Sequence, residues 1–422
     1  MKSLEDIAAS LQGYDPQALR ADAASAFLQE LVNPVSESVT VPLLESLGRV
    51  LAQDVISPID VPAHDNSAMD GFALRGSELS DQPTAFEVVG TLHAGTVPGT
   101  APGAGQCVRI MTGAVMPQGL DTVIPQELVQ WHGERVVVPA GLLRAGDNRR
   151  LAGEDLRKGA PALLAGSTVA PASLGLLASI GLEQVKVYRR LKVAYFSTGD
   201  EIMQLGESPR LGAVYDSNRY TVFGLLTRMG IEVLDLGLVR DNPEALEAAF
   251  TQAAAQADAV ITSGGVSVGE ADHTKATMRK LAGSSIAFWK IAMRPGRPMA
   301  VGRIGKCPLF GLPGNPVAVM VTFLAFVRPA LLKMMGSTAP PPPLLQARAM
   351  HPIRKKPGRT EYQRALVQVN AEGQLQAKIT GNQGSGILSS MVQANGLLVL
   401  PHDQGDIATS DTVSLMMFEG LI

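Results

Sequence analysis

The stretch from Asp258 to Lys275, DAVITSGGVSVGEADHTK, decides the fold. Asp258 to Thr262 predicts a short buried strand, and residues 263–269 form a loop of glycine, serine and valine. Glycine permits positive φ and close backbone approach, and the free N–H groups of a following helix attract phosphate. We therefore expect Gly264, Gly265 and Gly269 in an anion-binding loop, followed by a helix that opens at residues 270–275.

Two other interpretations of this loop stay open. It is also compatible with an ordinary tight turn in which Asp272 caps the helix. Residues 265–269, GVSVG, match the elbow of serine hydrolases, which would make Ser267 a nucleophile. An elbow needs its helix to begin at the serine, whereas here a double glycine precedes Ser267 and an acidic turn follows. An aspartate in a phosphate-binding loop indicates that a cation lies between the two.

Composition indicates a multidomain globular protein. The chain has 422 residues, of which 46% are hydrophobic and 18% charged, and single cores seldom exceed roughly 300 residues. Its net charge of −3 gives no general attraction to nucleic acid. The only cysteines, Cys107 and Cys307, exclude a disulfide scaffold and favour a cytoplasmic location. Residues 160–182 are uncharged, but prolines and glycines interrupt them, so we expect no membrane span.

Changes in the hydrophobic pattern along the chain predict four domains. Residues 1–54 show two apolar stripes typical of helices, one around Phe27 and one formed by Leu43, Leu44, Leu47 and Val50. With residues 140–187 they form a discontinuous N-terminal linker or dimerisation domain. Residues 55–139 predict an inserted β domain, residues 188–336 an α/β domain, and residues 344–422 a C-terminal β barrel behind a proline-rich linker.

Strand, loop and helix alternate from Leu191 onward, which predicts a doubly wound, mostly parallel sheet. Polar motifs follow the expected strands, at the edge where such sheets bind ligands. These motifs are STGDE at 197–201, RDN at 240–242, SGGVSVGEAD at 263–272, MRPGRP at 293–298 and GLPGNP at 311–316. We expect them to meet at one ligand site.

Carboxylates and cations are both expected along this edge. The carboxylates are Glu201, Asp241 and Asp272, and the cations are Lys275, Lys290, Arg294 and Arg297. Acidic oxygens beside basic groups suit a divalent metal that bridges phosphoryl oxygens, and hard oxygen ligands favour Mg²⁺ over zinc. Elsewhere, the stretch from Asp65 to Asp70 and the hydroxyl of Thr112 are typical of turns when each is taken alone.

Five motifs together resemble the MoeA and gephyrin E-domain family, the molybdenum-insertion enzymes of molybdenum cofactor synthesis. They are DNSAMDG at 65–71, RIMTGA at 109–114, STGDE, SGGVSVGEAD and GLPGNP. The resemblance runs from about Leu47 to Ser390. Because SGGVSVG also occurs in relatives that share only the α/β domain, DNSAMDG separates this chain from them.

The resemblance implies an elongated homodimer whose active cleft uses both subunits. The implied reaction turns adenylylated molybdopterin and molybdate into molybdenum cofactor and AMP, with Mg²⁺ as cofactor. It also implies contact with a molybdopterin adenylyltransferase, and no nucleic-acid or membrane partner. Two alternatives stay open: an adenylyltransferase-type enzyme, which would release pyrophosphate from ATP, and a non-catalytic scaffold.

Site residues follow from the resemblance by motif position. The implied catalytic residues are Asp70, Thr112, Glu201, Asp241 and Asp272, and the implied metal ligands are Glu201, Asp241 and Asp272. The implied substrate-binding residues are Ser197, Gly264, Gly265, Ser267, Gly269, Lys275, Lys290, Arg294, Arg297, Pro313, Pro316, Arg359 and Ser385. Family members often have lysine where Arg294 and Arg297 stand. A planar guanidinium therefore replaces a point charge at both positions and changes the expected contacts.

Overall fold

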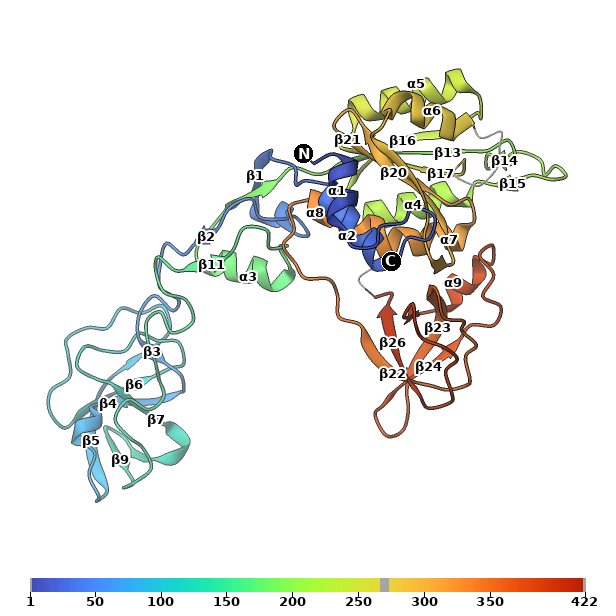
Figure 1. The fold of residues 1–422 in the computed structure, drawn as a ribbon. Coiled ribbons are helices and arrows are strands. Elements are labelled where there is room, and N and C mark those ends of the chain that lie inside the picture. The colour runs from blue at the N-terminus through green and yellow to red at the C-terminus, as the bar shows by residue number, and fades with distance from the viewer. Residues whose placement is uncertain (1, 266–272, 420–422) are drawn as a thin grey trace.

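The computed structural model describes residues 2–265 and 273–419. Its centre is a six-stranded sheet in the order β16-β13-β17-β21-β20-β18 (Figure 1). The strands are β13 (Lys192–Thr198), β16 (Glu232–Val239), β17 (Ala259–Ser263), β18 (Ile286–Lys290), β20 (Pro298–Ile304) and β21 (Cys307–Leu312). The first four in spatial order are parallel, whereas β20 is antiparallel to both neighbours. The predicted doubly wound, mostly parallel sheet is confirmed.

Helices cover both faces of this sheet. In Figure 1, α5 (Pro243–Gln256) and α6 (His273–Ala282) lie above the strands, and α4 (Ser217–Arg228) and α7 (Pro316–Thr322) lie below. Alternate residues of β13 serve the two layers, because Val193 and Tyr195 pack with α4 while Ala194 and Phe196 pack with α5. This alternation explains why residues 193–196 of β13 form an unbroken apolar run.

Strand β20 is not predicted from the sequence. Its first residue, Pro298, is the last residue of the MRPGRP motif. The chain instead forms a hairpin in which β20 turns at residues 305–306 into β21. Because β20 runs against its neighbours, it begins at the edge where β18 ends. The MRPGRP motif therefore lies at the same edge as the other motifs.

The N-terminal segment is only partly helical. Helices α1 (Leu4–Ser10) and α2 (Ala21–Leu31) bury the predicted stripe around Phe27. The second predicted stripe was wrong, because Leu44 and Leu47 are exposed and only Leu43–Ser46 form a short 3-10 helix, directly after β1 (Ser38–Pro42). Strand β1 pairs with the distant β12 (Gln184–Tyr188), so a long-range ladder overrides the local pattern.

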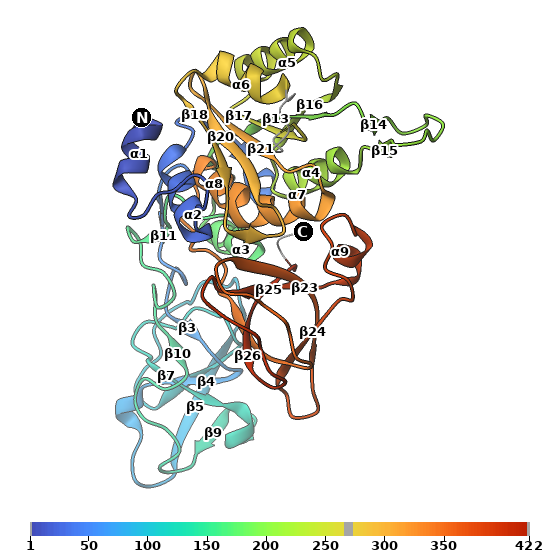
Figure 2. The ribbon, with the colours of Figure 1, turned by 45° about the vertical axis from the view of Figure 1, so that its right-hand side comes forward.

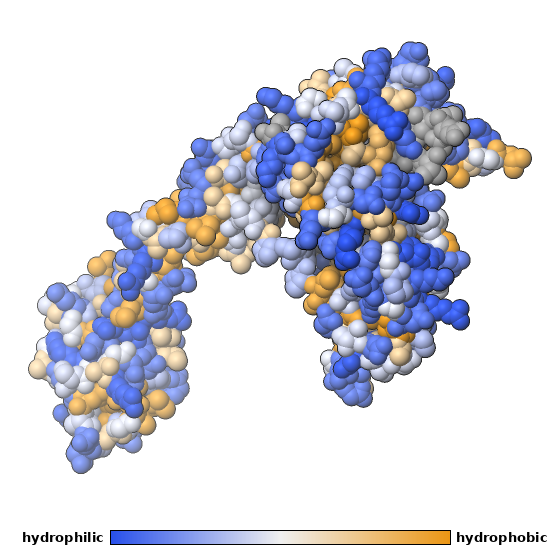
Figure 3. Space-filling model, viewed as in Figure 1, coloured by the Kyte–Doolittle hydropathy of each residue, from blue (hydrophilic) through white to orange (hydrophobic). Residues whose placement is uncertain are grey.

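An inserted lobe carries a second six-stranded sheet, in the order β7-β4-β6-β5-β9-β8. The strands are β4 (Gly71–Leu74), β5 (Thr84–Leu92), β6 (Gln106–Ile110), β7 (Thr122–Pro125), β8 (Gln130–His132) and β9 (Arg135–Val138). The chain enters the lobe after β2 (Val55–Ile56) and returns at β11 (Pro161–Leu163), which pair with each other. A narrow neck joins the lobe to the remaining protein (Figure 3).

The C-terminal strands close into a small barrel below the α/β layers (Figures 1 and 2). They are β22 (Leu345–Ala349), β23 (Thr360–Val369), β24 (Leu375–Ile379), β25 (Gly396–Leu400) and β26 (Thr412–Met417), and pairing of β23 with β25 completes the ring. The short strand β19 (Met293–Arg294), within the MRPGRP motif, pairs with β23. This pairing attaches the α/β domain to the barrel beside the ligand edge.

One helical stretch among the described residues, Pro316–Met334, is long and apolar enough to cross a membrane. It comprises α7, a π turn and α8 (Arg328–Met334), and its mean hydropathy is 1.8. The stretch is 72% buried inside the protein, where it packs against α2 and α4. Burial of this kind is typical of a core helix.

Candidate active site

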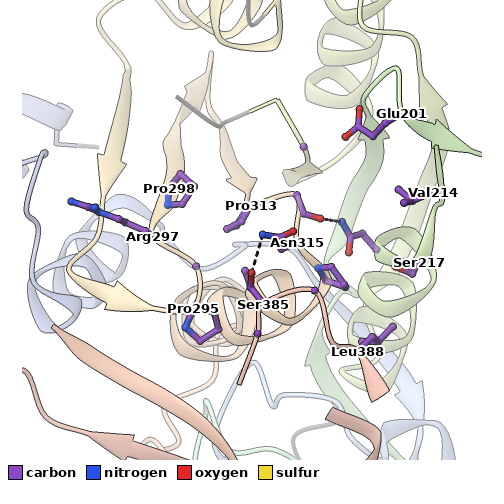
Figure 4. Close-up of a pocket in the computed structure, with 18 of the residues that line it drawn as sticks. Glu201, Val214, Ser217, Pro295, Arg297, Pro298, Pro313, Asn315, Ser385 and Leu388 are labelled. Carbon is purple, nitrogen blue, oxygen red and sulfur yellow. Dashed lines mark hydrogen bonds between the residues drawn. The ribbon is translucent and has the colours of Figure 1, made fainter. Parts of the chain in front are cut away.

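A cavity of about 1030 Å³ lies at the edge of the central sheet where β13, β17 and β21 end. Gly264 and Gly265 follow β17, residues 313–316 follow β21, and residues 293–298 connect β18 with β20. The barrel closes the cavity with residues 383–386 and Leu388. Figure 4 shows these segments around one hollow. Its volume suits a ligand larger than a single nucleotide base.

Opposite charges occupy opposite sides of the cavity. Glu201 lies on one side and Arg297 on the far side (Figure 4). Asp216 lines the cavity as well, as does a second arginine, Arg294. A ligand with an anionic part and a hydrogen-bond-donating part matches this separation.

The glycine turn after β17 has no room for side chains. Gly264 has φ +91°, and a Cβ there would lie 2.1 Å from the carbonyl oxygen of Thr198. Gly265 has φ +62°, and its Cβ would lie 2.3 Å from Oγ1 of Thr274. Only glycine fits both positions, so the loop passes tightly between the end of β13 and the start of α6.

The start of α4 forms one wall of the cavity. Asp216 caps this helix, because its Oδ1 accepts a hydrogen bond of 3.1 Å from the backbone N–H of Arg219. The same oxygen accepts a bond of 2.9 Å from the hydroxyl of Ser197. Asn218 donates to the carbonyl oxygen of Gly314 at 2.8 Å, which ties α4 to the GLPGNP motif.

A buried chain of hydroxyl groups supports this wall from below. The hydroxyl of Tyr195 lies 2.9 Å from that of Ser197 and 2.6 Å from that of Ser263. Burial raises the pKa of Tyr195, so the phenol keeps its proton. Predicted site residue Ser197 therefore contributes through Asp216, which it orients.

The barrel contributes a loop held by a buried arginine. Ser385 accepts a hydrogen bond of 2.9 Å from Asn315 (Figure 4), and its carbonyl accepts one from Val317. Below the loop, the fully buried guanidinium of Arg364 donates to the carbonyl oxygens of Asn382, Gln383 and Gly384. Arg364 thus fixes the loop that presents Ser385.

Eight of the predicted site residues line this one cavity. They are Glu201, Gly264, Gly265, Arg294, Arg297, Pro313, Pro316 and Ser385. They come from five segments far apart in the sequence, which the sheet topology brings to one edge.

Other predicted residues do not line the cavity. Oγ1 of Thr274, which packs on Gly265, lies 3.5 Å from a carboxylate oxygen of Asp241. Lys275 lies in the first turn of α6, and Lys290 ends β18. Arg359 forms an ion pair of 2.8 Å with the buried carboxylate of Glu361.

Asp70 and Thr112 are brought together, but in the inserted lobe. One carboxylate oxygen of Asp70 accepts hydrogen bonds of 2.7 Å from both the backbone N–H and the hydroxyl of Thr112. These two bonds hold the pKa of Asp70 below its usual value. Within one chain, this lobe is separate from the α/β domain that holds the cavity (Figure 1).

Three predicted residues, Ser267, Gly269 and Asp272, lie outside the described residues. The serine-hydrolase interpretation of Ser267 and the capping interpretation of Asp272 therefore stay predictions.

Sequence reasoning missed two polar residues of the cavity wall. Asp216 and Asn218 belong to none of the five motifs, and their residue types are typical of a helix start, which Asp216 indeed caps. Their place in the cavity depends on the hairpin of β14 (Ile202–Met203) and β15 (Val214–Tyr215), which returns the chain to the end of β13. The run from Val214 to Asn218, two apolar residues before three polar ones, is the local signal that was available.

The described residues contain no group of three His, Cys, Asp or Glu side chains that could hold a metal ion. Two of the three predicted ligands are described. The carboxylate of Glu201 folds back over Gly199 at the end of β13, and Asp241 follows the neighbouring strand β16. Both are hard oxygen donors at adjacent strand ends, so they fit Mg²⁺ as part of a ligand set.

The fold and cavity define a multidomain protein that binds its ligand at the carboxyl edge of a doubly wound α/β sheet. Three family models match in succession: the MoeA N-terminal region (domain I and II) at residues 19–181, a probable molybdopterin binding domain at 194–333, and the MoeA C-terminal region (domain IV) at 346–418. The chain belongs to the MoeA family.

Relatives match over nearly the full length. The chain is 42% identical to a molybdopterin molybdenumtransferase of Haemophilus influenzae, over 95% of this chain and 98% of that protein. It is 34% identical to one of Bacillus subtilis, over 90% of each. A crystal structure of a molybdopterin biosynthesis MoeA protein from Pyrococcus horikoshii matches with TM-score 0.82 and 26% identity, over 95% of this chain and all of that one.

Proposed function

We propose that this protein is a molybdopterin molybdenumtransferase. It uses adenylylated molybdopterin and molybdate, splits the phosphoanhydride, and releases molybdenum cofactor and AMP. The observation that carries the proposal is the cavity itself, which Glu201, Arg294 and Arg297 line together with a tight glycine turn. Family membership supports a role in molybdenum cofactor biosynthesis.

Each part of the cavity has a task in this reaction. The guanidinium groups of Arg294 and Arg297 hold the oxyanion that is exchanged, and their planar donors match phosphate or molybdate oxygens. The Gly264–Gly265 turn lets the anhydride approach the backbone closely. Glu201 and Asp241 are the described residues that would hold Mg²⁺. When bound, this ion neutralises negative charge on the anhydride.

The test is AMP release by the purified full-length protein, supplied with adenylylated molybdopterin, molybdate and MgCl₂. We expect Arg297→Gln to lower kcat/KM about 100-fold, because a donor to the reacting anion is lost. Lys306→Gln is the matched control, since it removes an exposed cation at the opposite edge of the same sheet. Equal activity of the two variants would refute the assignment of Arg297.

Magnesium dependence is tested in the same assay. We expect EDTA to abolish AMP release and MgCl₂ to restore it. The Glu201→Gln variant should require more MgCl₂ for half-maximal activity, because a neutral amide binds a hard cation more weakly than a carboxylate does. Full activity in EDTA would refute the metal role.

We further propose that the active form is a homodimer in which Asp70 and Thr112 of one subunit serve the cavity of the other. The separation of their lobe from the cavity within one chain supports this arrangement. Mixing inactive Asp70→Asn and Arg297→Gln subunits should restore part of the activity, since one cavity of each mixed dimer has both functional groups. A mixture as inactive as its components would refute the arrangement.

The adenylyltransferase alternative is not favoured, because relatives that match over nearly the full length are named molybdenumtransferases. Incubation with ATP and free molybdopterin separates the two functions. We expect no rapid release of pyrophosphate. A direct transfer of substrate from a molybdopterin adenylyltransferase is part of the proposal and is testable by co-purification.

A further inference from the structure

Two buried oxygen atoms on the cavity wall lack a hydrogen-bond donor. They are Oδ2 of Asp216 and Oδ1 of Asn218. Both residues line the cavity, although the side chains are more than nine-tenths buried, with 4% and 7% exposure. A buried acceptor without a donor is costly, so two of them on residues that line one cavity point to a ligand that donates hydrogen bonds.

The remaining polar atoms of both side chains are already used, which fixes the direction of the free oxygens. Oδ1 of Asp216 accepts from Ser197 and from the start of α4. The amide nitrogen of Asn218 donates to Gly314, so its oxygen is held on the other side. Neither free oxygen can turn to another partner unless one of these bonds breaks.

A cation fits these two oxygens less well than N–H donors do. They lie at the first turn of the twelve-residue helix α4, where the positive end of the helix dipole disfavours a positive ion. Among the described residues, no three acidic, histidine or cysteine side chains gather there. Two uncompensated acceptors at the start of one helix instead match a ligand with two N–H groups.

The positions of the charged residues in the cavity indicate how such a ligand is oriented. Figure 4 shows Glu201 and Ser217, the first residue of α4, on one side of the cavity and Arg297 on the other. A ligand with N–H groups at one end and anionic groups at the other is therefore held lengthwise. The pterin of molybdopterin has such a donor edge, formed by a ring N–H and the 2-amino group, and its phosphate and dithiolene lie at the opposite end.

We propose that Asp216 and Asn218 form the subsite that recognises the donor edge of the pterin ring. Oδ2 of Asp216 accepts from one N–H group and Oδ1 of Asn218 from the other, while the arginines hold the anionic end. This subsite rests on the proposed function for its natural ligand. The subsite offers two fixed acceptors to an amino-pyrimidinone ring, and binding of such a ring can be measured without turnover.

The test is fluorescence titration of the full-length protein with pterin-6-carboxylate and with its 2-oxo counterpart, lumazine-6-carboxylate. The second probe has an oxygen in place of the 2-amino donor. We expect the wild-type protein to prefer the pterin at least 10-fold, because a site built to accept hydrogen bonds rejects an analogue that lacks the donor.

Asp216→Asn is the informative variant. Asparagine still accepts the bonds from Ser197 and the helix through Oδ1, but it places an N–H₂ group where Oδ2 was. We expect pterin affinity to fall about 10- to 100-fold and the preference for pterin over lumazine to vanish, with AMP affinity and Tm unchanged. Asp6→Asn, which also removes a carboxylate near a helix start but lies in the exposed first turn of α1, should change none of these.

Three results would overturn the subsite. One is a folded Asp216→Asn protein that keeps the pterin preference. Another is equal wild-type affinity for both probes. The third is a variant that loses affinity for Mg²⁺ while it keeps affinity for the pterin, which would make Asp216 a metal ligand. If the wild-type protein shows the pterin preference yet releases no AMP from adenylylated molybdopterin, the subsite stands and the proposed function fails.

Discussion

Replacement of Arg364 by methionine tests how the barrel loop reaches the cavity. The guanidinium is fully buried and donates four hydrogen bonds, three to the carbonyl oxygens of residues 382–384 and one of 3.0 Å to the hydroxyl of Ser390. Methionine fills a similar volume without any donor. The loop would therefore lose every bond that ties it to the interior of the barrel through this side chain.

The expected loss of stability in Arg364→Met is worked out from these hydrogen bonds. Hydrogen bonds from a charged donor contribute about 1.5–3 kcal/mol each, so the gross loss is roughly 6–12 kcal/mol. Methionine avoids the several kcal/mol needed to bury the guanidinium, whose pKa burial lowers here. We expect a net destabilisation of about 3 kcal/mol, which corresponds to about 100-fold in the equilibrium between the docked and undocked loop.

Urea unfolding and hydrogen exchange of residues 382–386 measure this effect. Because the loop presents Ser385 to the cavity, KM for adenylylated molybdopterin should rise with the faster exchange. Arg348→Met is the matched control: this arginine of the same barrel also donates to a carbonyl and a hydroxyl, but it is exposed, so we expect a change below about 0.5 kcal/mol. Equal stability and equal exchange in both variants would refute the anchoring role.

Three further predictions concern the glycine turn, the inserted lobe and acid stability. Gly264→Ala should abolish AMP release and destabilise the protein more than Gly283→Ala, which has φ +56° but open space around its Cβ, as urea unfolding of both will show. Thr112→Val removes one of two hydrogen bonds to Asp70, so the pKa of that carboxylate should rise toward its ordinary value in an NMR titration; an unchanged pKa would contradict the pairing. Burial raises the pKa of Asp258, but hydrogen bonds from its partner arginine and a backbone N–H outweigh this and lower the pKa. The charged form therefore stabilises the fold above pH ~4, and this stability is lost as the pH falls through the depressed pKa. Asp258→Asn should destabilise the protein at pH 7, and urea unfolding should show a smaller difference from the wild type as the pH falls below about 4.

Elements with strong local patterns were predictable from the sequence. The alternation of strand and helix from Leu191 onward is confirmed, for example by the strand Glu232–Val239 and the helix that follows it, whose first residue is the local signal Pro243. The edge of the sheet where the motifs meet was also predictable, since parallel strands end at one side. These features can be predicted from the order of helices and strands along the chain alone.

Features that depend on distant partners were not predictable. The stripe from Leu43 to Val50 has helical spacing, yet its two ends make backbone hydrogen bonds to Glu183 and Tyr188, at the two ends of β12. Strand β20 could not be predicted because its first residue, Pro298, belongs to the MRPGRP motif. The two free acceptors of Asp216 and Asn218 could not be inferred either, because an unsatisfied oxygen is recognised only when all of its neighbours are placed.

The paired strands β2 and β11 at the neck have an engineering consequence. Val55 lies opposite Leu163, so the chain leaves for the inserted lobe and comes back at almost the same point. The whole lobe can therefore be cut out and the two ends rejoined with a short turn, or exchanged for the lobe of a relative, without creating new termini. A shortened chain of this kind would keep its own ligand cavity but lack Asp70 and Thr112. Ligand binding could then be measured separately from the reaction.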